Sequence, residues 1–423
     1  MIKTIRVSNV ENTASRLAVE PSQKNIKAVK SIICDVQKNG DSAILHYERK
    51  FGSPISSLKV TPHEIEQAFS TISKEQLDAI KLAKTRLKTA ESAIKSLLRD
   101  ITTFHGGVRL SKKFVPLESV GCYVPGGLAR YPSSAVMSII PAKVARVKRI
   151  VVVSPPNHDG KIDPLTIVSA SICGATEIYK TGGAQAIAAL SFGTSSIKKV
   201  DKIVGPGGEF VTLAKEAIRN NTAIDMLAGP TELGILADDS ANPHHIALDL
   251  ISQSEHSQDT RCFLITDSDI LAKSVKDELY SIIHTIKRRD IVQASLKNNG
   301  FIAVCKSIRE AIRLADALAP EHLQIITKRA QSVASQISSA GLILVGKYSP
   351  SAASDYLFGS NHILPTCGSG KSRGSLSVLD FVKVKAQAST TKSTLYHISK
   401  YMKVITDAEG LPNHYEAVRG RLG

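Results

Sequence analysis

The sequence predicts an α/β protein with two doubly wound, Rossmann-like parallel-sheet domains, a small N-terminal helical segment and a C-terminal tail domain. Two observations indicate this class. Short apolar or β-branched runs alternate with glycine turns and helical segments along residues 123–230, about 27 residues apart, as in a parallel sheet with crossover helices. A second series of the same kind follows residue 231.

The first 120 residues are predicted to be mainly helical. Residues 61–64 form a capping-box pattern with proline at the first helical position, and residues 73–76 form a second box. The second box opens a long helix with apolar residues at steps of three and four and lysines on its other face. The apolar stripe is Ile80, Ala83, Leu87, Ala90, Ile94 and Leu97. A strand-rich stretch follows at 108–124.

Strands and helices then alternate through both predicted sheets. In the first sheet Asp163-Pro164 caps a helix that stops at Gly174, and glycine turns at 182–183 and 205–208 precede two more helices. Predicted strands are 150–153, 177–180, 202–204, 233–237, 262–265, 301–304 and 342–345.

A long polar stretch at 348–377, rich in serine and glycine, is predicted to be a loop. Loops of this length inside a compact protein are either disordered or functional. The loop carries Asp355, His362 and Lys371, and the tail that follows carries Glu409 and His414.

These elements suggest four parts. We expect an N-terminal helical segment at 1–20 and a C-terminal tail domain at 379–423. Between them we expect a discontinuous α/β domain at 21–122 and 231–378 and a second α/β domain at 123–230.

Charge and composition exclude several classes of protein. The net charge is +16, and nine Lys/Arg residues fall between 81 and 113. Because most of them lie on the predicted amphipathic helix, we interpret them as its solvated face. Tryptophan is absent and no nucleic-acid-binding motif is present. No run approaches the ~18–20 apolar residues of a membrane span, and no export signal is visible. Six scattered cysteines without a CxxC pair favour reduced thiols, so we expect a cytoplasmic protein.

Two glycine-rich stretches approach nucleotide-binding motifs but fail on spacing. Residues 368–372 end like a phosphate-binding loop, but the first glycine of that motif would fall at Pro365. Residues 205–207 follow a predicted strand, but the third glycine of a dinucleotide fingerprint would fall at Phe210. Spacing therefore predicts only glycine turns at strand carboxyl ends, where α/β sheets bind ligands.

Dispersed polar residues indicate a metal site. Gln253 and His256 are three apart on a predicted helix and so share a face. Asp355 precedes His362 by seven residues in the long loop, and His414 lies near the C-terminus. Such nitrogen and oxygen donors suit zinc or another borderline divalent ion, although a single histidine is more often a surface or core residue.

Glu321 and His322 follow Ala319-Pro320. Helical neighbours point about 100° apart, so the two are poorly placed to share one metal but can face one pocket as separate proton-transfer groups. A helix that begins at the proline with an acidic first turn explains the same residues equally well.

These motifs together resemble the histidinol dehydrogenase family, nearly end to end and most strongly from residue 120 onward. The resemblance rests on Tyr-Val-Pro-Gly-Gly (123–127), Tyr-Pro-Ser-Ser (131–134), Gly-Gly-Ala-Gln-Ala (182–186), Ala-Gly-Pro-Thr-Glu (228–232), Gln-Ser-Glu-His (253–256), Pro-Glu-His-Leu (320–323), the stretch from Asp355 to Pro-Thr366, and Glu-Gly-Leu-x-x-His (409–414).

The resemblance implies oxidation of L-histidinol to L-histidine through the aldehyde, with two NAD reduced and one zinc per subunit. It implies that the domain at 123–230 binds NAD and that the discontinuous domain carries the catalytic and metal-binding residues. It also implies a homodimer with shared sites, in which the tail at 379–423 reaches the partner subunit. It implies Glu321 and His322 as the acid/base pair. The implied zinc ligands are Gln253, His256, Asp355 and His414. These four residues and His322 are also implied to contact the substrate. The further implied contacts are Thr231, His362 and Glu409 to the substrate, and Tyr123, Gln185 and Gly208 to NAD.

Three positions depart from the family pattern. Thr231 stands where serine is common, Ser254 replaces a usual alanine, and Gly208 replaces the usual asparagine of Gly-Pro-Gly-Asn. Two other functions fit parts of the sequence. One is a zinc hydrolase that uses Glu321 on metal-bound water, and the other is a non-enzymatic basic protein that binds nucleic acid.

Overall fold

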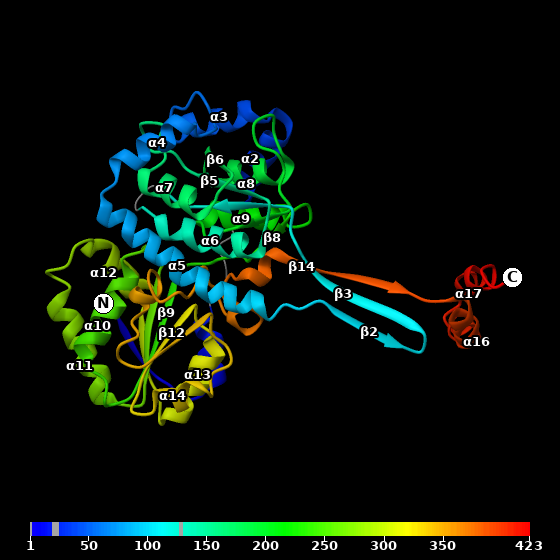
Figure 1. The fold of residues 1–423 in the computed structure, drawn as a ribbon. Helices are drawn as coiled ribbons and strands as arrows, with labels where there is room; N and C mark the ends of the chain where they lie inside the picture. Colours follow the sequence, from blue (N-terminus) through cyan, green and yellow to red (C-terminus); the bar gives the residue numbers. More distant parts are fainter. Residues whose placement is uncertain (1, 19–24, 127–129) are drawn as a thin grey trace.

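The computed structural model describes residues 2–18, 25–126 and 130–423, and it confirms an α/β fold with two parallel sheets (Figure 1). Most predicted strands occur within one or two residues of their expected bounds. Both predicted capping boxes form, at Thr61–Glu64 and Ser73–Gln76.

One sheet has six parallel strands and is covered by helices on both faces. Its strands are β1 (Lys3–Arg6), β9 (Glu232–Ala237), β10 (Arg261–Thr266), β11 (Phe301–Val304), β12 (His322–Ile326) and β13 (Leu342–Val345). Its helices are α1 (Val10–Leu17), α10 (Pro243–Ser254), α11 (Asp269–Ile282), α12 (Arg289–Asn298), α13 (Ile308–Leu318) and α14 (Ala330–Ala334). The strand order is β1-β11-β10-β9-β12-β13. Helices α10, α11 and α12 pack on one face, and α1, α13 and α14 on the other, so the strands are apolar runs without alternation.

The second sheet has five parallel strands in the order β6-β5-β4-β7-β8. Its strands are β4 (Ser119–Tyr123), β5 (Arg149–Ser154), β6 (Glu177–Lys180), β7 (Lys202–Val204) and β8 (Ala223–Ile224). Its helices are α2 (Ile26–Asn39), α3 (Asp41–Lys50), α4 (Pro62–Thr71), α5 (Lys74–Ser96), α6 (Pro132–Ala145), α7 (Pro164–Cys173), α8 (Gly183–Phe192) and α9 (Glu209–Ile218). Helices α6 and α7, with α4 and α5 outside them, cover one face, and α2, α3, α8 and α9 cover the other.

The packing groups the chain differently from the expected domain division. Residues 21–122 were expected to join 231–378, but α2–α5 share their cores with the five-stranded sheet. The expected helical segment 1–20 contains β1, which pairs with β11 in the six-stranded sheet. An apolar helical stripe shows that a helix is buried but not which sheet buries it, so periodicity alone did not determine this grouping.

The stretch around Glu321 and His322 is a strand and not a helix. Helix α13 ends at Leu318, and Ala319 adopts a left-handed conformation (φ 45°) as its C-cap. Pro320 therefore follows a helix end instead of starting a helix, a common position for proline. Strand β12 then begins at His322 and pairs with β9 and β13.

An arm extends away from the two α/β domains (Figure 1). It consists of an antiparallel sheet in the order β14-β3-β2, followed by two helices. These elements are β2 (Ile101–His105), β3 (Val108–Pro116), β14 (Val382–Ser389), α16 (Lys392–Ala408) and α17 (Pro412–Arg419). Ser399 and Thr406 are the buried residues of α16, and α17 has none, so the tail has almost no core of its own.

The predicted loop at 348–377 is largely irregular. It contains the short helix α15 (Ser351–Ser354) and the 3-10 turn η1 (Ser369–Lys371), and a second 3-10 turn, η2 (Val378–Phe381), follows it. Within the described ranges, no helix is both long and apolar enough to cross a membrane.

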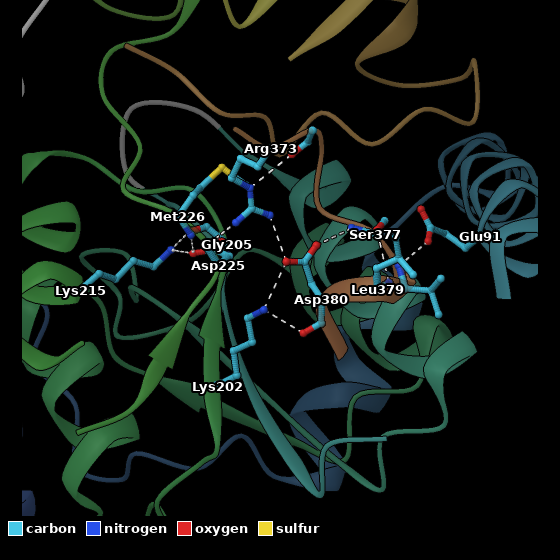
Figure 2. A network of polar contacts seen from close by, with 12 residues as sticks. Glu91, Lys202, Gly205, Lys215, Asp225, Met226, Arg373, Ser377, Leu379 and Asp380 are labelled. Carbon is cyan, nitrogen blue, oxygen red and sulfur yellow. Dashed lines mark hydrogen bonds and ion pairs between the residues drawn. The ribbon is translucent and has the colours of Figure 1, made fainter. Parts of the chain in front are cut away.

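Polar contacts hold the chain where it leaves this loop for the arm (Figure 2). The carboxylate of Asp380 accepts hydrogen bonds from Arg373 (3.0 Å) and Lys202 (3.2 Å). Glu91, a buried residue of α5, accepts the backbone N–H of Val378 at 2.6 Å. Burial raises the pKa of Glu91 to about 7, although this hydrogen bond opposes the shift. A buried carboxyl that prefers to be protonated therefore lies at the root of the arm.

This raised pKa predicts a dependence of stability on pH. Below pH 4.5 Glu91 is protonated in the folded and unfolded states, and its contribution to stability is complete. Between pH 4.5 and about 7 the unfolded chain releases this proton first, so the contribution is lost as pH rises. Relative to Glu91→Gln, the wild-type protein should lose up to about 1.4 kcal/mol of unfolding free energy per pH unit in this window.

Chemical denaturation of both proteins across the window measures this slope. Glu66→Gln, at an exposed position of α4, is the control for the loss of a glutamate side chain that is not buried. A pH-independent difference for Glu91→Gln would contradict the prediction.

Candidate active site

A cavity of about 810 Å³ lies between the two α/β domains. The five-stranded sheet contributes residues that follow the carboxyl ends of β4 and β7, Pro125 and the 205–209 turn. The six-stranded sheet contributes the amino ends of β9, β10 and β12, through Glu232, Arg261 and His322. The two sheets therefore face the cavity with opposite ends.

Most of the residues predicted from the sequence meet in this cavity. Its lining includes Gly208, Thr231, Gln253, His256, Glu321, His322, Asp355 and His362. It does not include Tyr123, Gln185, Glu409 or His414.

Glu321 is a buried carboxyl immediately before β12. Its Oε2 accepts the backbone N–H of Glu232 at 2.7 Å. Burial raises the pKa of Glu321 to about 8, against the effects of His322 and of this hydrogen bond. Such a carboxyl carries a proton at neutral pH and can exchange it with a bound molecule.

His322 lies between two oxygen acceptors. Its Nε2 is 3.2 Å from Oδ1 of Asp355, and its Nδ1 is 3.3 Å from the carbonyl oxygen of Glu232. Burial lowers the pKa of His322, but the hydrogen bond with Asp355 and the charges of Asp355 and Glu321 outweigh it and raise the pKa to about 9. The ring therefore favours its protonated form.

Gln253 and His256 lie near the end of α10. Gln253 is in its last turn, where its Oε1 accepts the hydroxyl of Ser351 at 3.3 Å. The helix ends at Ser254, so His256 lies beyond it and not on its face as predicted. Burial lowers the pKa of His256, which favours the neutral ring that binds metals.

The donors in the cavity suit zinc, but one chain holds an incomplete set. Gln253, His256 and Asp355 offer an amide, an imidazole and a carboxylate, which zinc accepts. Within the described residues, no three His, Cys, Asp or Glu side chains form a metal-binding cluster. The fourth predicted ligand, His414, is on α17, and Glu409 directly follows α16, both on the distant part of the arm (Figure 1).

His362 bridges the two domains at the cavity. Its Nδ1 lies 2.7 Å from the carbonyl oxygen of Asp355, and its Nε2 lies 3.3 Å from the hydroxyl of Ser134 on α6. Burial lowers the pKa of His362. The sequence motif at 131–134 contained Ser134 without indicating this contact.

Glu232 is a second residue that the sequence did not single out. Its backbone N–H and carbonyl contact Glu321 and His322, and its carboxylate lies 3.2 Å from Arg261 in a buried ion pair. Glu232 belongs to the motif at 228–232, but its role follows from the pairing of β9 with β12, which the sequence did not predict.

Tyr123 and Gln185 lie near the amino end of α8. Tyr123 Oη accepts the N–H of Gly183 at 3.1 Å, and Gln185 Nε2 donates to Oε1 of Glu48 at 2.9 Å. Gln185 Oε1 is buried, and it has no hydrogen-bond partner in the part of the chain that the structure describes. This amide oxygen is inaccessible to solvent and lies outside the residues that line the cavity.

Gly208 is the N-cap of α9 and lies in the cavity wall. Its φ of −69° is open to any residue, and a Cβ there would meet no atom within 4 Å. Glycine is therefore not required by the backbone at this position, and the space beside it is free.

Comparisons with known proteins agree over almost the whole chain. Residues 16–422 match the family model described as histidinol dehydrogenase. The chain is 42% identical to the histidinol dehydrogenase of Oceanobacillus iheyensis over 92% of this chain and 91% of that one. It is 40% identical to that of Bacillus subtilis, over 99% and 98%. A crystal structure of histidinol dehydrogenase from Elizabethkingia anophelis superposes with a TM-score of 0.93 at 31% identity, over 100% of this chain and 98% of that one.

The hydrogen bond from Glu232 to Glu321 predicts a difference between two substitutions. Glu321→Gln keeps an acceptor for the N–H of Glu232, whereas Glu321→Met fills a similar volume without one. Because a buried donor that loses its acceptor costs ~1–3 kcal/mol, Glu321→Met should be the less stable variant by about that amount. Denaturation of both variants at one pH measures it, and equal stability would show that this hydrogen bond does not hold the strand end.

Proposed function

Because the chain belongs to the histidinol dehydrogenase family, an oxidoreductase family, we propose that its interdomain cavity oxidises L-histidinol to L-histidine through the aldehyde, with two NAD reduced. The observation that carries the assignment to this cavity is the meeting of Glu321 and His322 with Gln253, His256 and Asp355 on its walls. The family assignment takes the place of the hydrolase and nucleic-acid-binding alternatives.

His322 is proposed as the group that accepts the hydroxyl proton. Each oxidation removes a hydride and a proton, and a positioned imidazole can take the proton. The ring accepts it only in the neutral form. Asp355, which raises the pKa of the ring, is also a proposed zinc ligand, so zinc and His322 compete for one carboxylate.

Glu321 is proposed to serve the second oxidation. An aldehyde must add water before it can lose a second hydride, and Glu321 can take a proton from that water in its ionised form. Because the pKa of Glu321 is about 8, this form is the minority at neutral pH and increases as the pH rises. The buried position of Glu321 also keeps bulk solvent away from the aldehyde, which limits side reactions of this intermediate.

Zinc would be held by Gln253, His256 and Asp355 with His414 of a second copy, and NAD would lie along the wall that includes Gly208. When bound, zinc would grip the substrate imidazole and amine, and NAD would accept the hydride. Gln185 and Tyr123, which the family resemblance implies as NAD contacts, are proposed to contribute to NAD binding from the five-stranded-sheet domain. Thr231 and His362 are proposed to contact substrate.

The exposed arm supports a homodimer that shares its sites. The arm exposes large apolar side chains that no other described part of the chain covers. Exposed apolar patches of this kind usually mark interfaces. The large apolar residues exposed on the arm are Ile101 and Phe104 on β2, Leu110 on β3, Val384 on β14, Tyr396, Tyr401, Val404 and Ile405 on α16, and Leu411 after it. We propose that a second copy covers this surface and receives Glu409 and His414 in its cavity.

We also propose a cytoplasmic location without a nucleic-acid partner. The cysteines are free in the described residues, which suits a reducing compartment.

The number of NADH molecules formed per histidinol tests the function. Two are expected, followed by absorbance with limiting histidinol. Chelation should abolish turnover, and added zinc should restore it. Absence of NADH from a folded, zinc-loaded protein would contradict the proposal and would favour the hydrolase alternative.

The division of proton transfer predicts different losses for two variants. His322→Ala should slow the oxidation of histidinol and of histidinal, because both release a proton, by about 10²–10⁴-fold. Glu321→Gln, which keeps the hydrogen bond to Glu232, should slow chiefly the histidinal step, because only that step consumes water. Equal losses on the two substrates for Glu321→Gln would contradict the division of roles.

A shared site predicts recovery of activity on mixing two inactive variants. In a mixed dimer of His322→Ala and His414→Ala, one cavity has every wild-type residue. A mixture of His322→Ala with Asp355→Ala is the matched control, because both residues line the same cavity and no intact site can form. No recovery in the first mixture, after mass spectrometry has shown subunit exchange, would place His414 in the site of its own subunit.

Restoring the family residue at Gly208 predicts tighter NAD binding. The backbone and the open space beside it accommodate asparagine. One neutral hydrogen bond contributes ~0.5–1.5 kcal/mol, so Gly208→Asn should lower the Michaelis constant for NAD about two- to twelve-fold. The constant for histidinol should stay nearly unchanged. Gly374→Asn, at an exposed glycine outside the cavity with equally open space, is the control, and an unchanged or raised NAD constant for Gly208→Asn would contradict the prediction.

A further inference from the structure

A buried ion pair lies behind the glycine turn that forms one wall of the cavity (Figure 2). Lys215 of α9 and Asp225, which follows β8, are joined by a 2.7 Å contact between Nζ and Oδ1. Their side chains are 3% and 0% exposed. Neither residue belongs to the proton-transfer pair or to the zinc ligands.

The pair holds both polar groups of Gly205. The N–H of Gly205 donates to Oδ2 of Asp225 at 2.7 Å, and the carbonyl of Gly205 accepts Nζ of Lys215 at 2.5 Å. Asp225 Oδ1 also accepts the N–H of Met226 at 2.6 Å. One salt bridge therefore fixes the backbone of two segments, the turn after β7 and the segment after β8.

Gly205 has a backbone conformation that requires glycine. Its φ is +114°, which residues with a side chain rarely adopt, and a Cβ would lie 2.1 Å from the carbonyl oxygen of Tyr123. Glycine adopts this φ without steric cost, but it can adopt many other conformations as well. The ion pair selects this one through hydrogen bonds to both the N–H and the carbonyl of Gly205.

Stability alone is a weak explanation for such a pair. Burying a lysine and an aspartate carries a desolvation penalty, and apolar residues of similar volume are often equally stabilising. An apolar pair would leave the two polar groups of Gly205 without these partners. What the ion pair provides in addition is therefore the placement of the turn.

That placement shapes the cavity. Gly205, Pro206, Gly207 and Gly208 line it, as do Asp225 and Met226, on the side contributed by the five-stranded sheet. Glu321 and His322 belong to the six-stranded sheet across the cavity. The ion pair therefore controls the wall that is proposed to bind NAD.

We propose that Lys215 and Asp225 are positioning residues for NAD: they hold the 205–208 turn in the shape against which the cofactor binds. This inference rests on the proposed function, because it assigns the turn to NAD. The pair is secured from outside by Arg373, which donates to the carbonyl oxygen of Asp225 and to the carboxylate of Asp380.

The test replaces the pair without leaving a buried charge. Lys215→Met/Asp225→Asn keeps the lysine stem and one carbonyl acceptor but removes the donor to Gly205. NAD affinity by calorimetry and the Michaelis constant for NAD should both weaken about ten-fold or more, as expected for a lost charge-assisted hydrogen bond. The Michaelis constant for histidinol should change less than about two-fold.

The matched control is Arg149→Met/Glu177→Gln. This ion pair (2.7 Å) also holds backbone carbonyls, those of Lys198 and Lys199, but it lies at the amino ends of β5 and β6, away from the cavity. Its loss should lower thermal stability without changing either Michaelis constant. A purely structural role for Lys215 and Asp225 predicts the same behaviour from both double variants.

Two further results decide the outcome. Lys215→Arg, which keeps a charge and a donor, should weaken NAD binding less than the double variant, and it provides the measurement if the double variant does not fold. Unchanged NAD affinity in either folded variant, or equal changes in both Michaelis constants, would overturn the proposal. Failure of the wild-type protein to form NADH would instead overturn the proposed function, so the two failures are distinguishable.

Discussion

The geometry of the proposed active site depends on how the two parallel sheets face the cavity. One sheet presents the carboxyl ends of its strands, and the other presents the amino ends. The five-stranded sheet presents the turn after β7, where its parallel strands end, and the six-stranded sheet presents the first residues of β9 and β12. Ligands in open α/β sheets usually bind at carboxyl ends, and the first sheet follows this rule. The second sheet supplies Glu321 and His322, the proposed proton-transfer groups, from the opposite end, where the pairing of His322 with Leu233 fixes the strand position.

Burial then determines how these groups behave. Glu321, His322 and Asp355 are nearly inaccessible to solvent, so their charges act on one another with little screening. Burial raises the pKa of Glu321 to about 8, while His322 and Asp355 stabilise each other as a charged pair. Glu321 and His322, which are adjacent at the start of β12, therefore have raised pKa values for different reasons. This difference suits the two proposed proton transfers, one from the hydroxyl and one from water.

Much of the fold could be predicted from sequence, because β-branched runs, capping boxes and glycine turns are local signals. Strand β12 was missed because Ala319-Pro320 fits a helix start as well as a helix end, and only the left-handed Ala319 distinguishes them. The assignment of α2–α5 to a sheet, the role of Glu232 and the clamp on Gly205 depend on contacts between distant segments. Motif resemblance found most cavity residues, and it assigned Glu409 and His414 to a tail expected to reach a partner subunit, which agrees with their absence from the cavity lining of their own chain.

The pairing of β3 with β14 has a consequence for synthesis of the protein. These strands, Val108–Pro116 and Val382–Ser389, are adjacent in the arm although most of the chain separates them. During translation the β2–β3 hairpin emerges early, and one edge of β3 stays open until almost the last residues leave the ribosome. Open edges invite pairing with other chains, and lysine is a common protection. Lys112 and Lys113 on this edge therefore repel other nascent copies, even though Lys113 later lies opposite Lys385 in the finished sheet, where like charges weaken the pair.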